Sequence, residues 1–162
     1  MPLDLYYLDA SPPVRAVLLA GKTLGVEFNL KFVDLFKLEQ RSPEFLKINP
    51  RHTVPTLVDD GFVLWDSHAI VGYLANKYGK DDSLYPKDPK ARAIVDEMLH
   101  FDNGTLFPRL RNITCLVPGI ASHPKLAAWV EKCKRNMVGY EEANQKGLDN
   151  FNLYVRKARG EA

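Results

Sequence analysis

Residues 49–67, NPRHTVPTLVDDGFVLWDS, decide the fold of this chain. Two short apolar runs are separated by Asp-Asp-Gly at 59–61, a link that is typical of a β-hairpin. Val54-Pro55 stands just before the first run, where a proline indicates a turn and a cis peptide is one option. Asp66-Ser67 marks the start of a helix. The stretch therefore predicts a turn, a hairpin and a helix N-terminus close together, which suits a small anionic ligand.

The residues on the N-terminal side of this stretch predict a β-α-β pattern. Residues 3–8 read as a short apolar strand, and after Ser11-Pro12-Pro13 the stretch VRAVLLAGKTLG (14–25) shows helical spacing, with Gly25 as the end of the helix. Residues 28–35 alternate as a second strand, and a short helix begins at Ser42-Pro43. With the hairpin and a helix over 67–78, the order is βαβ-α-ββα. This order predicts a small α/β sandwich and not a doubly wound sheet.

The second half of the chain predicts helices only. Residues 81–88 are a polar, proline-containing linker, and three helical segments follow it. They cover a helix capped by Asp88, a helix over 124–137 and a weaker helix over 139–155. We therefore expect an α/β domain over residues 1–80, a linker over 81–88 and an all-helical domain over 89–162.

The composition narrows the class of protein. The chain has 162 residues, 46% of them hydrophobic, and a net charge of +2, which is too small to favour nucleic acid or an anionic membrane as a partner. No apolar run reaches the roughly 20 residues that a spanning helix needs. The two cysteines form no CxxC or Cys/His cluster, so we expect neither a zinc site nor a disulfide scaffold. The first residues lack the basic region of a signal peptide, and a cytoplasmic location is expected.

Several motifs, in order and correctly spaced, resemble those of insect cytosolic glutathione transferases of the delta or epsilon classes. They are ASPPVRAVLLAGKTLG, SPEFLKINPRHTVPTLVDDGF, WDSHAIVGYLANKYGKDDSLYP, FDNGTLFPRLRNIT and, near the end, HPKLAAWVEKCKRNMVGYEEANQKG. The Asp-Ser-His start of the helix favours the epsilon class. The resemblance implies a thioredoxin-like N-terminal domain followed by an all-helical domain. Thioredoxins carry a redox CxxC before the first helix, but Ser11-Pro12-Pro13-Val14 stands there, which excludes dithiol chemistry.

Ser11 has two interpretations on its residue type alone. A serine before a helix is a plain N-cap as often as a functional group. The resemblance implies that the Ser11 hydroxyl donates a hydrogen bond to the sulfur of bound glutathione and is therefore the catalytic residue. The glutathione thiolate is then the nucleophile, and the nearby helix N-terminus helps to lower the pKa of the thiol.

The start of the helix at 67 also has two interpretations. On the residues alone, Ser67 caps the helix and Asp66 complements its dipole. The resemblance implies that Ser67 and the free backbone N–H groups bind the γ-glutamyl carboxylate of glutathione, while Asp66 pairs with the ammonium of the same group.

Further contacts with glutathione are implied by the resemblance. The residue before the cis proline, Val54, pairs its backbone with the cysteinyl part, and His52 contacts the glycyl end. Gln40 stands where relatives usually carry a second His, and it can donate a hydrogen bond but carries no charge, so weaker binding of the glycyl carboxylate is expected. The full implied set is Gln40, His52, Val54, Pro55, Asp66, Ser67 and His68. The residues implied for the hydrophobic substrate are Pro13, Leu35, Phe107, Leu110 and Arg111, although apolar residues at helical spacing are core more often than pocket.

The helical domain departs from the family pattern because it is too short. Family members have several more helices between residues matching Thr114 and Pro124, including a core helix that begins with Ser/Thr-x-x-Asp. Here the segment Cys115–His123 stands in their place, and no Ser/Thr-x-x-Asp occurs after residue 84. Without that helix, Met98, Phe101 and Trp129 must repack into a smaller bundle or be covered by dimerisation.

The leading interpretation is an enzyme, a transferase that joins the glutathione thiolate to hydrophobic electrophiles such as xenobiotics, in detoxification. Glutathione is then a co-substrate, no metal is needed, and a homodimer is expected. The alternative is a glutathione-binding or interaction module with little turnover, because part of the helical domain is missing. A deglutathionylating thiol enzyme is disfavoured since residue 11 is not a cysteine.

Overall fold

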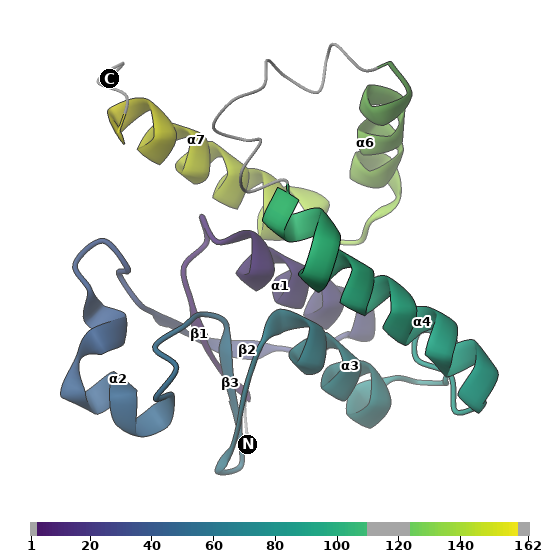
Figure 1. Ribbon diagram of the computed structural model, residues 1–162, viewed down its shortest axis with the longest axis horizontal. Coiled ribbons are helices and arrows are strands. Elements are labelled where there is room, and N and C mark those ends of the chain that lie inside the picture. Colours follow the sequence, from purple (N-terminus) through teal and green to yellow (C-terminus); the bar gives the residue numbers. More distant parts are fainter. Residues whose placement is uncertain (1–2, 110–123, 159–162) are drawn as a thin grey trace. The chain divides into compact units, whose positions relative to one another are not determined.

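The computed structural model of the chain describes residues 3–109 and 124–158 (Figure 1). The chain divides into two compact units, and each is described by itself. The first unit joins the chain up to Tyr78 with the segment that begins at Met137, and the second is Gly79–Asn136. The domain limits given above from the sequence stay a prediction.

A four-stranded sheet forms the centre of the first unit. Its strands are β1 (Leu3–Tyr7), β2 (Phe28–Phe32), β3 (Thr56–Asp59) and β4 (Phe62–Trp65). The order in the sheet is β2-β1-β3-β4, with β1 and β2 parallel and the other two pairs antiparallel. Strand β2 is shorter than the predicted 28–35, because the Asp34 carboxylate accepts hydrogen bonds from the backbone N–H groups of Phe36 and Lys37 and starts a turn.

Helices cover both faces of this sheet. They are α1 (Pro12–Leu24), α2 (Pro43–Ile48) and α3 (Ser67–Tyr78). Figure 1 shows α1 and α3 on one side of the strands and α2 on the other. Residues of β1, β3, α1 and α3 form the core; those with no exposed surface are Leu5, Val17, Leu57, Ile70 and Leu74. On the opposite face, Phe45 of α2 meets Tyr6 edge to face, with ring centroids 5.6 Å apart.

Two turns follow the sequence prediction closely. Helix α1 ends at Gly25, which has φ +71° and closes the last turn through its backbone N–H. The β3–β4 link turns at Asp60 and Gly61, which both have positive φ, the geometry that a tight two-residue hairpin requires. The predicted hairpin is therefore confirmed.

The C-terminal segment belongs to the first unit. A π-helical turn (Glu141–Gln145) leads into α7 (Lys146–Ala158). Both pack against α1. The sequence predicts one weak helix over most of this range, and it does not predict the packing against α1.

The second unit contains the helices α4 (Pro89–Phe101) and α6 (Pro124–Asn136), with a π-helical turn (Asp102–Leu106) after α4. As predicted, the Asp88 carboxylate caps α4 by accepting from the Ala91 N–H (2.8 Å). Among the described residues of this unit no apolar side chain is fully buried, and Trp129 is 60% exposed. The predicted short loop Cys115–His123 lies outside the described residues.

Candidate functional site

The sheet register brings the predicted site residues to one end of the first unit. Because β1 and β4 both run antiparallel to β3, the end of β1, the start of β3 and the end of β4 meet at the same edge. Ser11 follows β1, Val54-Pro55 precedes β3, and Asp66-Ser67 follows β4. The parallel strand β2 ends at this same end of the sheet, and Leu35 and Gln40 follow it in the chain. We call this the site end of the sheet.

Ser11 occupies the N-cap position of α1, yet its hydroxyl does not cap the helix. The next two residues, Pro12 and Pro13, have no N–H to offer a capping hydroxyl. The backbone of Ser11 is held instead, since its N–H donates to Leu8 O (2.9 Å) and its carbonyl accepts from Arg15 N–H (3.1 Å). Of the two interpretations of Ser11, the side-chain cap is therefore not observed.

The start of α3 corrects one expectation from the sequence. Asp66, and not Ser67, caps the helix: its Oδ1 accepts from the backbone N–H groups of His68 (2.9 Å) and Ala69 (3.3 Å). Asp66 reaches this position with a left-handed φ of +75°, which residue type alone does not predict. Ser67 becomes the first residue of the helix and is only 7% exposed, and its Oγ lies 3.5 Å from His68 Nδ1. An acid, a hydroxyl and an imidazole thus share one helix N-terminus.

The loop before β3 is braced by Asn49, a residue that the sequence interpretation missed. Asn49 is fully buried, and its Nδ2 donates to Thr56 Oγ1 (2.8 Å) and Thr53 O (3.1 Å). Within this braced loop the Val54–Pro55 peptide is cis, the option raised by the sequence. His52 is exposed and has a left-handed φ of +48°. An Asn in front of a proline turn was the available signal, because Asn bonds readily to nearby backbone.

The remaining predicted residues fall into three groups. Gln40 lies in a 3₁₀ turn (Glu39–Arg41), and its buried Oε1 accepts no hydrogen bond within the described part of the chain. Leu35 and Pro13 are half-buried in the first unit, whereas Phe107 belongs to the second unit. Leu110 and Arg111 lie outside the described residues.

Arg15, on the first turns of α1, is a second residue that the sequence interpretation missed. Its side chain is buried, and its Nη1 donates to Ala10 O (2.9 Å), the residue before Ser11. Burial lowers the pKa of the guanidinium, while the neighbouring Tyr140 and Asp9 side chains act in the opposite direction. The loop that carries Ser11 is therefore anchored through the Ala10 carbonyl by the buried Arg15 guanidinium.

The opposite end of β3 carries a saturated polar cluster. Asp59 Oδ2 accepts from Tyr73 Oη (2.6 Å), Lys77 Nζ (2.6 Å) and Tyr78 Oη (2.8 Å). Burial raises the pKa of Asp59, but the three hydrogen bonds and the Lys77 charge outweigh it and lower that pKa to about 2. We call these four residues the Asp59 cluster; it fastens the hairpin to the second half of α3.

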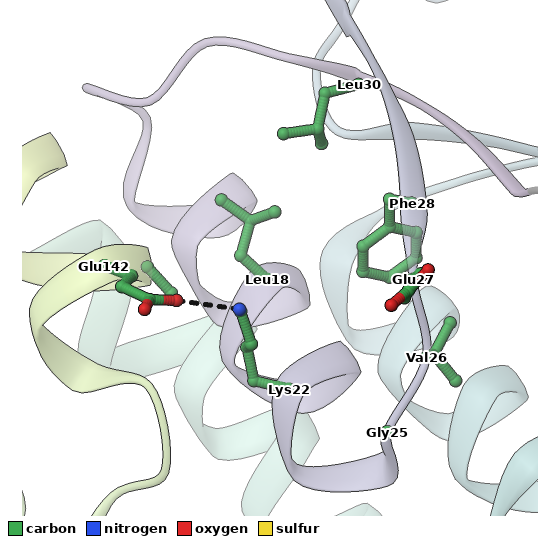
Figure 2. A pocket seen from close by; sticks show the side chains of 9 residues that line it. Leu18, Lys22, Gly25, Val26, Glu27, Phe28, Leu30 and Glu142 are labelled. Atoms are coloured by element: carbon green, nitrogen blue, oxygen red, sulfur yellow. Dashed lines mark ion pairs between the residues drawn. The ribbon is translucent and has the colours of Figure 1, made fainter.

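A cavity of about 500 Å³ lies between α1, β2 and the π-helical turn (Figure 2). Figure 2 shows apolar side chains such as Leu18 and Phe28 along it, with the Lys22–Glu142 ion pair (2.7 Å) nearby. Lys22 follows Ser11 by eleven residues of helix, about 16 Å at 1.5 Å per residue. The Lys22–Glu142 ion pair therefore lies away from the Ser11 end of α1.

The described residues contain neither a candidate membrane-spanning helix nor a candidate metal centre. None of the helices there combines the length and the apolar character needed to cross a membrane. Over the same residues, no three His, Cys, Asp or Glu side chains come close enough together to hold a metal ion.

Comparison with known proteins places this geometry in context. Residues 10–77 match the sequence family described as glutathione S-transferase, N-terminal domain. Glutathione S-transferase 1 of Manduca sexta is 58% identical over 113 residues, which are 68% of this chain and 52% of that protein. The chain spans about half the length of the curated relatives it matches.

Solved structures extend the likeness over most of the chain. A delta-class glutathione transferase of Nilaparvata lugens aligns with a TM-score of 0.88 and 36% identity, covering 96% of this chain and 99% of that chain. An epsilon-class glutathione S-transferase of the housefly, Musca domestica, aligns with a TM-score of 0.84 and 38% identity, covering 96% and 97%. The predicted fold, a thioredoxin-like domain followed by a helical region, is confirmed by these likenesses.

Proposed function

This chain belongs to the insect delta/epsilon-class glutathione S-transferases, and on that basis we propose that it binds glutathione at the site end and transfers it to hydrophobic electrophiles. The observation that carries the proposal is the hydroxyl of Ser11, which stands at the N-terminus of α1 without capping it. A hydroxyl so placed can donate a hydrogen bond to a sulfur anion.

Ser11 acts by stabilising the thiolate and not by attacking the substrate. A free thiol of this kind has a pKa of about 8.5, so little thiolate exists at neutral pH. A hydrogen bond from Ser11 and the positive end of the α1 dipole both favour the anion and lower the pKa of the thiol. The thiolate then forms a C–S bond with the electrophilic carbon, and the leaving group departs with its electron pair.

The other groups of the site end hold the rest of glutathione. Asp66 carries the charge that an ammonium group needs, and Ser67 with the first N–H groups of α3 suits the carboxylate beside it. The backbone of Val54 offers strand-like pairing to the cysteinyl part. His52 and the Nε2 donor of the Gln40 side chain are assigned to the glycyl end, and His68 completes the set.

The hydrophobic substrate, the partner and the location follow from the family. The residues proposed for the hydrophobic substrate on the family resemblance are Pro13, Leu35, Phe107, Leu110 and Arg111. We expect a cytoplasmic homodimer that acts on lipophilic electrophiles. The alternative, a binding module with little turnover, is less well supported because the relatives are named as transferases.

The test compares Ser11→Ala with the parent chain in glutathione binding and in turnover of a chlorodinitrobenzene substrate. Loss of one hydrogen bond to a charged group is worth about 1.5–3 kcal/mol, so kcat should fall about 10- to 100-fold while glutathione is still bound. Ser83→Ala, at an exposed serine before α4, is the matched control and should leave both unchanged. Parental turnover in Ser11→Ala would contradict the role of Ser11, and binding without turnover in the parent would favour the binding module.

A further inference from the structure

The C-terminal segment of the first unit reaches back to the loop that carries Ser11. We propose that Asn144, Gly147 and Asn150 are positioning residues, which fix the Ser11 hydroxyl through Arg15 and Asp9. The proposal rests on the proposed function, since it assigns to this segment a share in stabilising the glutathione thiolate.

The first link runs through the buried guanidinium of Arg15. Arg15 Nε donates to Asn144 Oδ1 (2.9 Å), although the two residues are 129 positions apart, and Nη1 donates to Ala10 O (2.9 Å). Arg15 is 7% exposed, so each of its N–H groups needs a partner within the protein. Asn144 thereby fixes the orientation of the Arg15 guanidinium, and the guanidinium in turn holds the carbonyl of Ala10, the residue before Ser11.

The second link runs through the carboxylate of Asp9. Asn150 Nδ2 donates to Asp9 Oδ2 (2.7 Å), while Asp9 Oδ1 accepts from the Ala10 N–H (2.9 Å). Ala10 is therefore held at both of its backbone polar groups, at the N–H by Asp9 and at the carbonyl by Arg15. Arg15 is in turn hydrogen-bonded to Asn144, and Asp9 is hydrogen-bonded to Asn150, both in the C-terminal segment.

Gly147 allows the close approach that both links need. A Cβ at this position would lie 2.0 Å from Asp9 O and 2.6 Å from Arg15 Cδ. Only a residue without a side chain lets the start of α7 lie directly on this loop. The two asparagines and the glycine come from one short stretch, so they act together.

This arrangement should matter more for the thiolate than for glutathione affinity. The strength of a hydrogen bond depends steeply on distance and angle, and a shift of about 1 Å in a positioned group can cost 100-fold in rate. The proposed anchors of the γ-glutamyl and cysteinyl parts lie outside these two links, Ser67 at the start of α3 and Val54 in the loop before β3. A displaced Ser11 would therefore leave glutathione bound but would return its thiol towards the ordinary pKa.

The Lys22–Glu142 ion pair supplies a matched control. It also joins the C-terminal segment to α1, but it lies beside the cavity near the other end of the helix (Figure 2). Both side chains are more than half exposed. Glu142→Gln therefore disturbs the same segment without touching the loop that carries Ser11.

The test measures the pKa of the bound glutathione thiol from its ultraviolet thiolate absorbance, together with the affinity for S-methylglutathione, which has no thiol. In Asn144→Ala the pKa of the bound thiol should rise by about one unit, a tenfold loss of thiolate stabilisation, and kcat should fall about tenfold. Affinity for S-methylglutathione should stay within about twofold of the parent, because its anchors lie elsewhere. Asn144→Asp keeps the acceptor for Arg15 and should restore the parental pKa, and Glu142→Gln should match the parent.

Three results would overturn the proposal. One is a parental thiol pKa and parental kcat in Asn144→Ala. Another is an equal loss of thiolate and of S-methylglutathione binding, which would indicate a merely structural role. If Asn144→Ala does not fold, Asn150→Ala is measured in the same way, and a parental thiol pKa there contradicts the proposal. Failure of the proposed function itself is distinguished by the parent chain, which would then show no thiolate absorbance with glutathione.

Discussion

The two ends of the sheet treat polar groups in opposite ways. At the site end, the Ser11 hydroxyl makes no capping bond, and Gln40 Oε1 is buried without a hydrogen-bond partner among the described residues. At the other end, the Asp59 cluster satisfies one carboxylate with three donors. Unsatisfied polar groups cost folding free energy, whereas a saturated cluster stabilises the fold. Under the proposed function, the unsatisfied groups at the site end serve the ligand, whereas the Asp59 cluster serves stability.

The largest effect on stability is expected at Asn49, the buried residue that braces the loop before β3. Its side chain is fully buried and makes four hydrogen bonds, to Arg51, Thr53 and Thr56, so Asn49→Ala removes these bonds and leaves a cavity. The free energy of unfolding should fall by about 3 kcal/mol. Chemical denaturation measures it, and Asn29→Ala, at an exposed asparagine with a single partner, should change it by less than about 0.5 kcal/mol. Equal effects of the two changes would mean that the loop is not braced by Asn49.

The Asp59 cluster should make the stability depend on pH in acid. The pKa of Asp59 is about 2 in the folded chain and 3.8 ordinarily. As the pH falls, Asp59 is therefore protonated in the unfolded chain at a higher pH than in the folded chain. The stabilisation is complete above about pH 4 and is lost as the pH falls towards 2, for a total of about 2 kcal/mol. Asp59→Asn should therefore lower the free energy of unfolding by about this amount at pH 7 and by almost nothing near pH 2.

The control for this titration is Asp60→Asn, in the neighbouring exposed turn position. Asparagine tolerates the left-handed backbone that Asp60 adopts, so the hairpin should be kept. Denaturation curves between pH 2 and 7 should coincide for this variant and the parent. A parental pH dependence in Asp59→Asn would show that the cluster does not stabilise the fold.

Local sequence signals account for much of the fold but not for how the site is held. The Asp-Asp-Gly link and Gly25 fix their turns through the backbone preference of single residues, and α3 covers the predicted 67–78. The bond between Arg15 and Asn144 spans 129 residues, and no periodicity within a helix indicates such a contact. The exchange of roles between Asp66 and Ser67 was missed because it depends on a positive φ at Asp66. Long-range polar contacts and backbone exceptions are thus what sequence patterns left undetermined.

The smallest effect should also have the opposite sign, and it tests the site end directly. Gln40→Met removes a buried oxygen that has no partner among the described residues, so the free energy of unfolding should stay level or rise by up to about 1 kcal/mol. The same change removes the hydrogen bond proposed for the glycyl end of glutathione, and affinity should fall about tenfold. Gln145, whose amide donates to Asp149 (2.9 Å), is the partnered counterpart, and Gln145→Met should be slightly destabilising. Calorimetry of glutathione binding and denaturation of both variants give the four values. If Gln40→Met lowered stability as the Asp59 change does, the two ends of the sheet would not differ in kind, because Gln40 would then be a structural residue like Asp59.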